Sequence, residues 1–263
     1  MGLLDGRVAM VTGATRGVGK GVALALAEAG ATTYATGRSA GVETFGGASR
    51  IIPLACDHTD DAQVESAFRR VADESGRLDL LVNSVWGGYD RMIEDGRFTW
   101  NLPFWEQPVW RWDAMFSAGV RAAYVASRHA ARAMVAQRSG LIVNISFWAA
   151  RKRIGNVAYG ASKAATDKIT ADMAEELKPH EVSVVSLYPG LVRTERVMEA
   201  AAFLDLANSE SPLFVGRAAA ALAADPDVGG KSGRAVTAAE LALEYGFTDV
   251  DGAQPRPLTP DGL

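Results

Sequence analysis

Short apolar runs alternate along the chain with longer segments whose apolar residues recur every three or four positions. In segments such as 19–30 and 61–76 this period predicts helices, and Asp60 with Gln63 predicts a capping box for the second. Strands that are apolar on both faces need cover on both faces. The pattern therefore predicts a doubly wound α/β fold with seven parallel strands and helices on both faces. The runs that predict these strands, rich in β-branched residues, are 7–12, 31–36, 50–55, 78–83, 140–145, 182–187 and 233–237.

No internal repeat, low-complexity tract or shift in composition divides the 263 residues, so we expect one domain over residues 1–263. The least regular stretches are 86–112 and 195–212. In open α/β sheets, the loops at the carboxyl ends of the strands surround the ligand. We therefore expect 86–112 to form an aromatic insert, and 195–212 a substrate loop, at that edge of the sheet.

Composition and charge exclude several classes of partner. A net charge of -4 and a pI near 5.5 leave no broad basic surface for nucleic acid. The single cysteine, Cys56, allows neither an intramolecular disulfide nor a cysteine-based metal cluster, and the histidines lack metal-ligand spacing, so we predict no metal site. The first residues lack the basic-then-apolar order of a secretory signal, and no apolar run is long enough for a membrane span. We expect a cytoplasmic protein with no membrane partner.

The first predicted strand runs into a glycine-rich turn that precedes a helix. Gly13, Gly17 and Gly19 follow the order G-x-x-x-G-x-G. Small residues there let the backbone approach a pyrophosphate, and the helix amino terminus offers unpaired N–H groups with about half a positive charge. A glycine pattern alone can also mark an ordinary tight turn, but the order of strand, turn and helix favours a dinucleotide site.

The end of the second predicted strand indicates which dinucleotide is preferred. Gly37 and Arg38 stand where an enzyme that uses NAD places a carboxylate for the ribose hydroxyls. A guanidinium can hold a 2′-phosphate through paired charge-assisted bonds, and Arg16 in the glycine turn lies within reach of the same group. We therefore predict NADP(H) in preference to NAD(H). The alternative is that both arginines are ordinary solvated surface residues.

Tyr159 and Lys163 are four residues apart in an alanine-rich helical segment, so both side chains leave the same face of the helix. An ammonium within about 4–6 Å of a phenol favours the phenolate, so we expect Lys163 to lower the pKa of Tyr159. Ser146 ends a predicted strand, at a carboxyl end where its hydroxyl can orient a substrate carbonyl. Together these three residues predict a catalytic site, although the pair alone would more often be a solvated helix face.

These motifs together resemble the short-chain dehydrogenase/reductase family over essentially the whole chain. The matches are T-G-x-x-x-G-x-G at 12–19, Y-x-x-x-K at 159–163 with the upstream serine, and P-G at 189–190. The resemblance implies a Rossmann-type NAD(P)-binding domain, with Lys163 on the nicotinamide ribose. It further implies that Asp57 contacts adenine and Thr194 the nicotinamide carboxamide. The cofactor-binding residues that it implies are Gly13, Thr15, Arg16, Gly17, Val18, Gly19, Arg38, Asp57, Asn83, Tyr159, Lys163, Pro189, Gly190, Val192 and Thr194.

The sequence departs from the family pattern at two places. The N-N-A-G motif after the fourth strand is here N-S-V-W, which keeps Asn83 but places Trp86 where small residues are usual. Gly119 stands where a catalytic asparagine normally holds a water that relays protons from the lysine. Since general acid catalysis typically contributes about 10²- to 10⁴-fold, this departure affects the expected efficiency more than the assignment of Ser146, Tyr159 and Lys163.

All six tryptophans lie in the part of the chain expected around the nicotinamide, and Phe147 and Trp148 directly follow Ser146. With Trp86 they predict apolar walls for a bulky hydrophobic substrate. Packing in the core or at a subunit interface is the alternative for any one of them. The basic run 151–153 suggests either a site for an anionic substrate tail or, more simply, a solvated loop.

Together these features predict a carbonyl reductase or alcohol dehydrogenase that transfers hydride between NADP(H) and a small-molecule carbonyl or alcohol, with Tyr159 as the acid/base. Two alternatives stay open. One is an NADPH-binding protein with little catalysis, which serves sensing or assembly, and the other is a reductase of activated carbon–carbon double bonds. The family resemblance also suggests a homodimer or homotetramer that packs through the segments 122–138 and 161–178.

Overall fold

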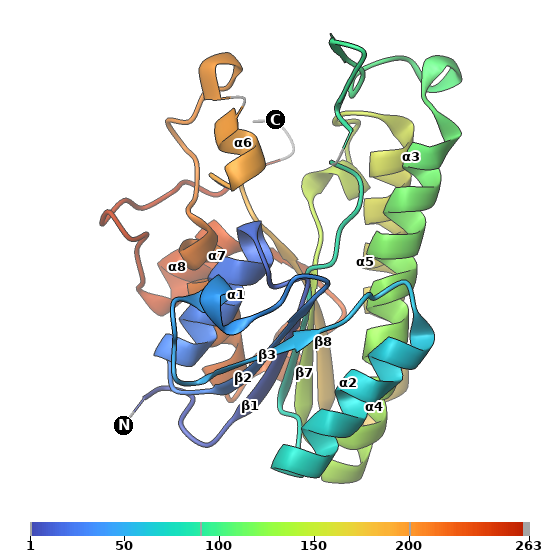
Figure 1. The fold of residues 1–263 in the computed structure, drawn as a ribbon. Helices are drawn as coiled ribbons and strands as arrows, with labels where there is room; N and C mark the ends of the chain where they lie inside the picture. The colour runs from blue at the N-terminus through green and yellow to red at the C-terminus, as the bar shows by residue number, and fades with distance from the viewer. Residues whose placement is uncertain (1, 90, 200, 260–263) are drawn as a thin grey trace.

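A central sheet of parallel strands organises the molecule, and the computed structural model describes it over residues 2–89, 91–199 and 201–259. Asp90 in the expected aromatic insert and Ala200 in the expected substrate loop lie outside the described residues. Each of the seven apolar runs forms a strand of one sheet, so the predicted architecture is confirmed (Figure 1). In spatial order the strands are β3 (Ile51–Ala55), β2 (Thr32–Gly37), β1 (Val8–Thr12), β4 (Leu80–Asn83), β7 (Gly140–Ile145), β8 (Val182–Tyr188) and β9 (Ala235–Thr237).

The order of the strands reverses between β1 and β4. The chain runs outward from β1 to β2 and β3, then returns to place β4 on the other side of β1, with Thr12 paired to Asn83. Such a switch point opens a crevice outside the carboxyl ends of the strands, where doubly wound folds bind ligands. The glycine turn follows β1 at this switch point.

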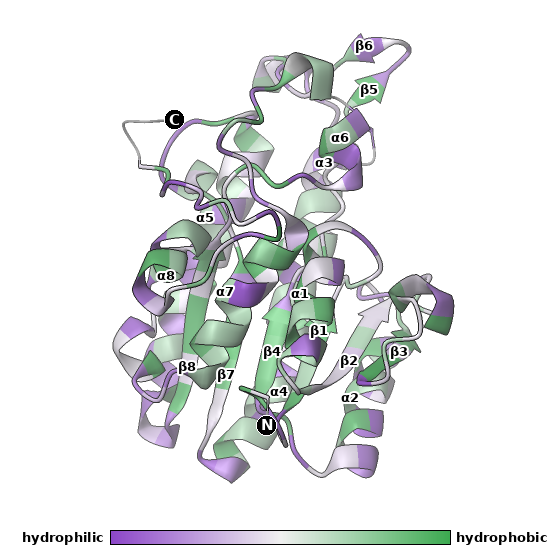
Figure 2. Cartoon of the chain, turned by 90° about the vertical axis from the view of Figure 1, so that its left-hand side faces the viewer, coloured by the Kyte–Doolittle hydropathy of each residue, from purple (hydrophilic) through white to green (hydrophobic). Residues whose placement is uncertain are grey.

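Two layers of helices cover the sheet (Figure 1). α1, α7 and α8 lie on one face, and α2, α4 and α5 lie on the other. Figure 2 shows the apolar strands between helices that turn polar residues outward, the pattern expected for a parallel sheet buried on both sides. The α-helices are α1 (Gly17–Glu28), α2 (Asp61–Ser75), α3 (Val109–Ala114), α4 (Ala122–Gln137), α5 (Val157–Leu177), α6 (Glu195–Glu199), α7 (Pro212–Ala224) and α8 (Ala238–Tyr245).

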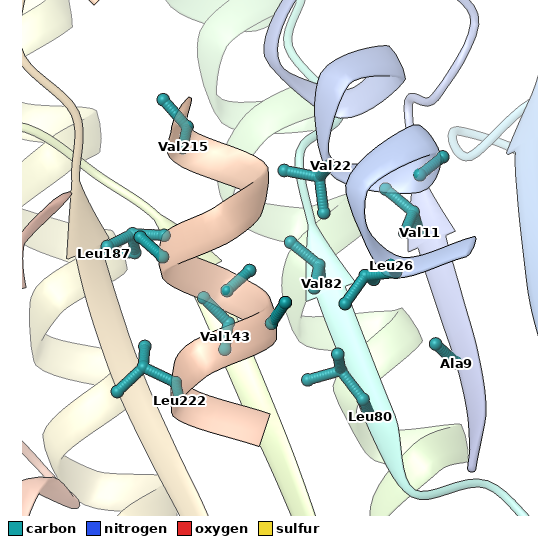
Figure 3. Packing of buried hydrophobic residues seen from close by; sticks show 14 of the residues in the cluster. Ala9, Val11, Val22, Leu26, Leu80, Val82, Val143, Leu187, Val215 and Leu222 are labelled. Atoms are coloured by element: carbon teal, nitrogen blue, oxygen red, sulfur yellow. The ribbon is translucent and has the colours of Figure 1, made fainter. Parts of the chain in front are cut away.

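The larger part of the core lies between the sheet and the pair α1 and α7 (Figure 3). Val22 and Leu26 of α1 and Leu222 of α7 are fully buried against the strands. The two helices approach so closely that a Cβ atom on Gly21 would lie 2.2 Å from the carbonyl carbon of Pro212. Glycine in α1 therefore serves helix packing as well as the cofactor turn.

The start of α2 forms only part of the capping box that the sequence predicts. Asp60 caps the helix by accepting hydrogen bonds from the N–H groups of Ala62 and Gln63. The Gln63 side chain, however, accepts from the Asp57 N–H at 2.9 Å instead of the N–H of the capping residue. The expected capping box is therefore only half formed, and its glutamine fixes the loop that carries Asp57.

The expected aromatic insert is more ordered than its sequence indicates. It contains a short antiparallel hairpin, β5 (Ile93–Glu94) with β6 (Arg97–Phe98), and rises beyond the carboxyl edge of the sheet (Figure 2). After α3, the segment η3 (Met115–Arg121) is a π-helix that leads directly into α4. Short 3₁₀ turns complete the chain: η1 (Val42–Phe45), η2 (Phe104–Glu106), η4 (Trp148–Ala150), η5 (Lys178–His180), η6 (Ala201–Phe203) and η7 (Val228–Lys231).

Candidate active site

The glycine turn after β1 leaves no room for a side chain at Gly13 or Gly19. Gly13 and Gly17 have φ values of 67° and 54°, in the left-handed region that favours glycine. A Cβ atom on Gly19 would lie 2.2 Å from the carbonyl oxygen of Gly13. The turn and the first residues of α1 therefore form a bare backbone surface, which fits the close approach of a pyrophosphate at a helix amino terminus.

A carboxylate of this chain already contacts that surface. Glu195, the first residue of α6, accepts a hydrogen bond from the Gly17 N–H at 3.0 Å. The methyl group of Thr194 would lie 3.3 Å from a Cβ atom on Gly17. The predicted substrate loop thus touches the predicted cofactor turn, and a negative group occupies one of its N–H donors. This contact spans 178 positions in sequence, and the sequence carries no signal for it.

The end of β2 meets the same turn. A Cβ atom on Gly37 would lie 2.7 Å from the Thr15 methyl carbon, so a carboxylate-bearing side chain does not fit at this position without displacing Thr15. Arg38 follows with an exposed side chain. The N–H and hydroxyl of Thr59 lower the pKa of Asp57, and Arg38 adds a smaller contribution in the same direction. The guanidinium and this carboxylate therefore lie near one another at the candidate adenosine end.

Asn83, at the end of β4, holds the sheet to α4. Its amide nitrogen donates to Ser127 at 2.9 Å and to Asn144 at 2.8 Å, and Asn144 in turn donates to Thr170 of α5. The Asn83 amide nitrogen is therefore used within the protein, whereas its Oδ1 is buried without a hydrogen-bond partner.

The three candidate catalytic residues gather where β7 meets α5. Asn156 caps α5 by accepting from the Tyr159 N–H at 3.0 Å, which fixes the first turn of the helix. Tyr159 and Lys163 are both buried, with the lysine Nζ 5.9 Å from the centre of the tyrosine ring. The buried Ser146 donates from Oγ to the carbonyl oxygen of Lys163 at 3.4 Å. Strand end and helix thus bring these groups into one cluster.

The electrostatics of this cluster differ from the sequence expectation. Burial raises the pKa of Tyr159 well above its ordinary value, and Tyr89 raises it further, so the expected lowering by Lys163 is wrong for this arrangement. The lysine Nζ instead donates to the carbonyl oxygen of Ile145 at 3.2 Å. Burial lowers the pKa of Lys163 to about 8. The cost of an isolated buried charge outweighs the attraction between ammonium and phenolate here.

Trp86 joins the two departures from the family pattern into one feature. Its ring centre lies 4.2 Å from the Lys163 Nζ, a cation–π contact, and 5.7 Å from the Tyr159 ring. A Cβ atom on Gly119 would lie 2.8 Å from Cζ3 of the same indole. The tryptophan thus occupies the space that a side chain at position 119 would need, beside both Lys163 and Tyr159.

Tyr159 is surrounded by an aromatic cluster that consists of Trp86, Tyr89, Trp100 and Phe147. The ring centres of these residues lie between 5.3 and 6.3 Å from that of Tyr159. The Tyr89 hydroxyl donates to the Tyr159 hydroxyl at 3.3 Å. Sequence reasoning missed Tyr89, and the available signal was its place three residues after Trp86 in the same insert.

The other aromatic residues do not join this cluster. Trp148 packs edge-on against Tyr188 at 5.4 Å and lines a cavity of about 540 Å³ beside β9 and α8. Arg151 of the basic run lies 5.9 and 6.0 Å from the centres of these two rings, and both Arg151 and Arg153 are exposed, as in the solvated loop considered for this run. Phe104, Trp105 and Trp112 are exposed on the outside of the insert. The predicted grouping of all six tryptophans around the nicotinamide is therefore wrong.

A fully buried arginine, Arg111, holds the insert together. Its guanidinium donates to the carbonyl oxygens of Thr99 and Arg91, each at 2.9 Å, and to the Gln107 side chain. It also lies 5.9 Å from the ring centre of Trp100. Burial lowers the pKa of Arg111. This one side chain ties backbone groups of the hairpin region together and so places Trp100 against Tyr159.

The start of the substrate loop is fixed by buried carboxylates. A Cβ atom on Gly190 would lie 2.8 Å from Oε1 of Glu210, which accepts from the Gly190 N–H, and burial raises the pKa of Glu210 to about 7. Asp249 accepts from the Ser211 N–H at 2.8 Å and from Arg193 at 3.0 Å. The loop therefore leaves and rejoins the fold at two anchored points. Pro189 and Val192 lie just before it, and Val192 forms a parallel bridge with Glu210.

Neither a membrane span nor a metal site occurs in the part of the chain that the structure describes. None of its helices is both long and apolar enough to cross a bilayer. Within the same residues, no three side chains of histidine, cysteine, aspartate or glutamate gather as metal ligands would.

A family model, sequence relatives and solved structures all relate this chain to short-chain dehydrogenases and reductases. The family model of the short chain dehydrogenases matches residues 7–204. Dehydrogenase/reductase SDR family member 1 of Mus musculus is 40% identical over 95% of this chain and 85% of that protein. The 3-oxoacyl-acyl-carrier-protein reductase FabG of Vibrio harveyi is 30% identical over 73% of this chain and 76% of its own length. A short-chain type dehydrogenase/reductase from Mycobacterium marinum superposes with a TM-score of 0.75 at 27% identity, covering 89% of this chain and 94% of that one.

Proposed function

Because this chain belongs to the short-chain dehydrogenase/reductase family, whose members use a nicotinamide cofactor, we propose that it transfers hydride between NADP(H) and the carbonyl or alcohol group of a bulky hydrophobic substrate. The observation that carries this proposal is that Tyr159 is buried among apolar rings, with the Lys163 Nζ 5.9 Å from its ring centre and Ser146 hydrogen-bonded to the same helix. When bound, the nicotinamide would supply the hydride. Tyr159 donates the proton to the substrate oxygen, and Ser146 orients that oxygen.

Burial defines the roles of Tyr159 and Lys163. A phenol whose pKa is raised is protonated at neutral pH, which is the form that reduction of a carbonyl requires, but it is a weaker acid than a free phenol. A lysine with a pKa of about 8 is mostly charged at pH 7, and its ammonium can stabilise negative charge that develops on the tyrosine oxygen. The family resemblance also implies that this ammonium binds the nicotinamide ribose, in addition to its present contacts with the Ile145 carbonyl oxygen and the Trp86 ring.

The preference for NADP(H) rests on the end of β2. Gly37 has no room for the carboxylate that would hold ribose hydroxyls, and the exposed Arg38 follows it. A 2′-phosphate would gain charge-assisted bonds to this guanidinium. We expect Arg38→Ala to weaken NADPH binding about tenfold, with little effect on NADH, in fluorescence titrations of the purified protein. Equal affinities of the unsubstituted protein for both cofactors would contradict the preference.

The substrate class rests on the aromatic cluster. Trp86 and Phe147, which the sequence indicates, and Trp100 and Tyr89, which the fold adds, supply apolar walls around the Tyr159 hydroxyl. Trp148 is not part of this wall because it packs against Tyr188. We therefore expect bulky aromatic or aliphatic ketones and aldehydes to be reduced faster than small polar ones.

The test is oxidation of NADPH by the purified protein across bulky and small ketones, aldehydes, quinones and enones. Tyr159→Phe should reduce turnover at least about 10³-fold, since the proton donor is lost. Tyr124→Phe is the matched control, because this tyrosine is 52% exposed. A purified protein that binds NADPH but consumes none of it would contradict the proposal. Product analysis on the enones distinguishes reduction of the carbonyl from reduction of the double bond.

One observation favours a second candidate function, a cofactor-binding protein with little catalysis. The Trp86 indole fills the space beside Gly119, Lys163 and Tyr159, where the family pattern expects an asparagine and its water. Such a protein would bind NADPH as tightly after Tyr159→Phe as before and would show no turnover in either form. The same assay therefore separates the two candidates.

A further inference from the structure

Tyr89 connects the catalytic tyrosine with the outside of the protein. Its hydroxyl donates to the Tyr159 hydroxyl at 3.3 Å, whereas 37% of its own surface is exposed. Tyr159 itself is only 7% exposed. One side chain thus has its hydroxyl at the reacting oxygen and another part of its surface in contact with solvent.

The orientation of Tyr89 is fixed by its neighbours in the aromatic cluster. Its ring centre lies 5.2 Å from that of Trp100 and 5.7 Å from that of Trp86, and both tryptophans also pack on Tyr159. Buried Arg111 holds Trp100 in place through the insert. The hydroxyl contact is therefore built into the packing and is not the chance position of a free side chain.

The Trp86 indole leaves little room for another proton route to Tyr159 past position 119. Gly119 offers no polar side chain, and the Trp86 indole lies against it. The Lys163 Nζ faces that indole and donates to the Ile145 carbonyl oxygen. A water chain from the lysine past position 119 would have to pass through the volume of an aromatic ring.

We propose that Tyr89 is a further catalytic residue that returns a proton to Tyr159 during turnover. This inference rests on the proposed oxidoreductase function. As the Tyr159 O–H bond breaks and its proton passes to the substrate oxygen, the Tyr89 hydroxyl proton passes to the Tyr159 oxygen. In the same step a solvent proton passes to the Tyr89 oxygen, so neither phenol is left as a phenolate. One solvent proton is consumed for each hydride that reduces a carbonyl carbon, and both phenols are restored.

The chemistry of the two groups suits such a transfer. Both are phenols, so moving a proton between their oxygens changes the energy little when their surroundings are similar. A separate phenolate in this buried cluster would be costly, and burial raises the pKa of both tyrosines. Proton transfer through Tyr89 that is concerted with donation by Tyr159 avoids that isolated charge.

The first test compares Tyr89→Phe with Tyr124→Phe. The phenylalanine keeps the ring that packs on Trp86 and Trp100 and removes only the hydroxyl. We expect kcat to fall about 10- to 100-fold with KM changed less than about twofold, a loss at or below the usual contribution of acid–base catalysis. Added imidazolium buffer or a small phenol should restore kcat of this variant in proportion to its concentration, and should leave the Tyr124→Phe protein unaffected.

A second variant separates proton transfer from packing. Tyr89→His keeps a group that can relay a proton, so it should retain more activity than Tyr89→Phe and lose it as pH rises through about 6.5, where histidine titrates. An unchanged or higher kcat in Tyr89→Phe, or a loss that neither added acid nor histidine restores, would overturn the relay. In either case an active parent protein with an inactive Tyr159→Phe variant would leave the proposed function standing.

A further readout does not depend on turnover. In protein labelled with ¹³C at tyrosine Cζ, Tyr89→Phe should change the shift and the titration of the Tyr159 signal, because its hydrogen-bond partner is lost. Tyr124→Phe should leave that signal unchanged. An unaltered Tyr159 signal after Tyr89→Phe would show that the two hydroxyls do not interact, and would overturn the proposal even if the protein has no activity on the substrates tried.

Discussion

The glycine turn and the aromatic cluster occupy two parts of the same carboxyl edge and are built on opposite principles. At the turn, the structure requires glycine: Gly13 and Gly17 have positive φ, and a Cβ atom on Gly19 would lie only 2.2 Å from its nearest neighbour. At the cluster, rings pack around Tyr159 and fill the space beside Gly119. The glycine turn depends on residues without side chains and follows the family pattern. The aromatic cluster depends on large side chains and departs from the family pattern.

The largest expected effect is at the glycine turn. In Gly19→Ala, the new methyl group would lie 2.2 Å from the Gly13 carbonyl oxygen, so the backbone must move. We expect the free energy of unfolding to fall by about 3 kcal/mol and NADPH affinity to fall at least about tenfold. Gly41→Ala is the control, because a Cβ atom at that position would meet nothing beyond its chain neighbours within 4 Å. Urea unfolding and cofactor titration measure both quantities. A Gly19→Ala protein as stable as the control would contradict this account of the turn.

At the aromatic cluster, Gly119→Asn introduces the residue that the family pattern places there. Its Cβ would lie 2.8 Å from Cζ3 of the Trp86 indole, so we expect a loss of about 2 kcal/mol in the free energy of unfolding. In a Trp86→Ala background the same change should cost at least about 1 kcal/mol less, because the ring is gone. Denaturant unfolding of the four proteins in this double-mutant cycle measures the coupling.

Ser117→Asn, at an exposed position of the same π-helix, is the control for Gly119→Asn and should change stability little. Equal costs of Gly119→Asn with and without Trp86 would mean that the two departures from the family pattern are independent. If they are coupled as expected, restoring the asparagine alone cannot restore a water relay.

The same contrast explains which features could be predicted from the sequence. The strands are short runs rich in apolar and β-branched residues, such as Val182–Tyr188, and each glycine of the turn is needed by the backbone itself, so both leave local signals. The position of Trp100 against Tyr159 depends instead on Arg111, an arginine that a sequence reading places on the surface. Its burial follows from tertiary hydrogen bonds to the hairpin region, which no local pattern encodes.

The catalytic cluster was predictable in composition but not in electrostatics. The spacing of Tyr159 and Lys163 places both on one face of α5, as expected. The direction of the tyrosine pKa depends on how deeply the pair is buried and on Tyr89, 70 positions away in the sequence. Glu195 on the Gly17 N–H is a similar long-range contact. Such contacts arise from loop conformations, which the apolar pattern does not constrain.

The substrate loop contacts the glycine turn, and buried Glu210 supports it near Gly190. Burial raises its pKa from 4.5 to about 7, so the folded protein takes up a proton that the unfolded chain lacks between these values. The free energy of unfolding should therefore fall as pH rises from about 4.5 to about 7, and stay lower above. Glu210→Gln should remove this dependence and stabilise the protein at pH 8 by about 1 kcal/mol.

Thermal unfolding at pH 5, 6, 7 and 8 measures this effect, with Glu43→Gln on the exposed η1 turn as the control. Asp249 raises the pKa of Glu210 and Arg193 lowers it. Both residues are present in the parent protein and in the two variants. If Glu210→Gln were less stable than the parent protein at pH 8, the carboxylate would be ionised and well solvated in the folded state, which its burial argues against.

The smallest expected effect is at the contact between loop and turn, where Glu195 accepts from the Gly17 N–H. A carboxylate at a helix amino terminus contributes about 0.3–1 kcal/mol, and the phosphates of a bound dinucleotide would have to displace it. Glu195→Gln should therefore raise NADPH affinity about two- to fivefold and lower the melting temperature of the cofactor-free protein slightly. Glu199→Gln, at the other end of α6, is the matched control because its carboxylate pairs with Arg196. Weaker NADPH binding by Glu195→Gln alone would instead mean that this carboxylate helps to hold the cofactor, and the loop would then belong to the cofactor site as much as to the substrate site.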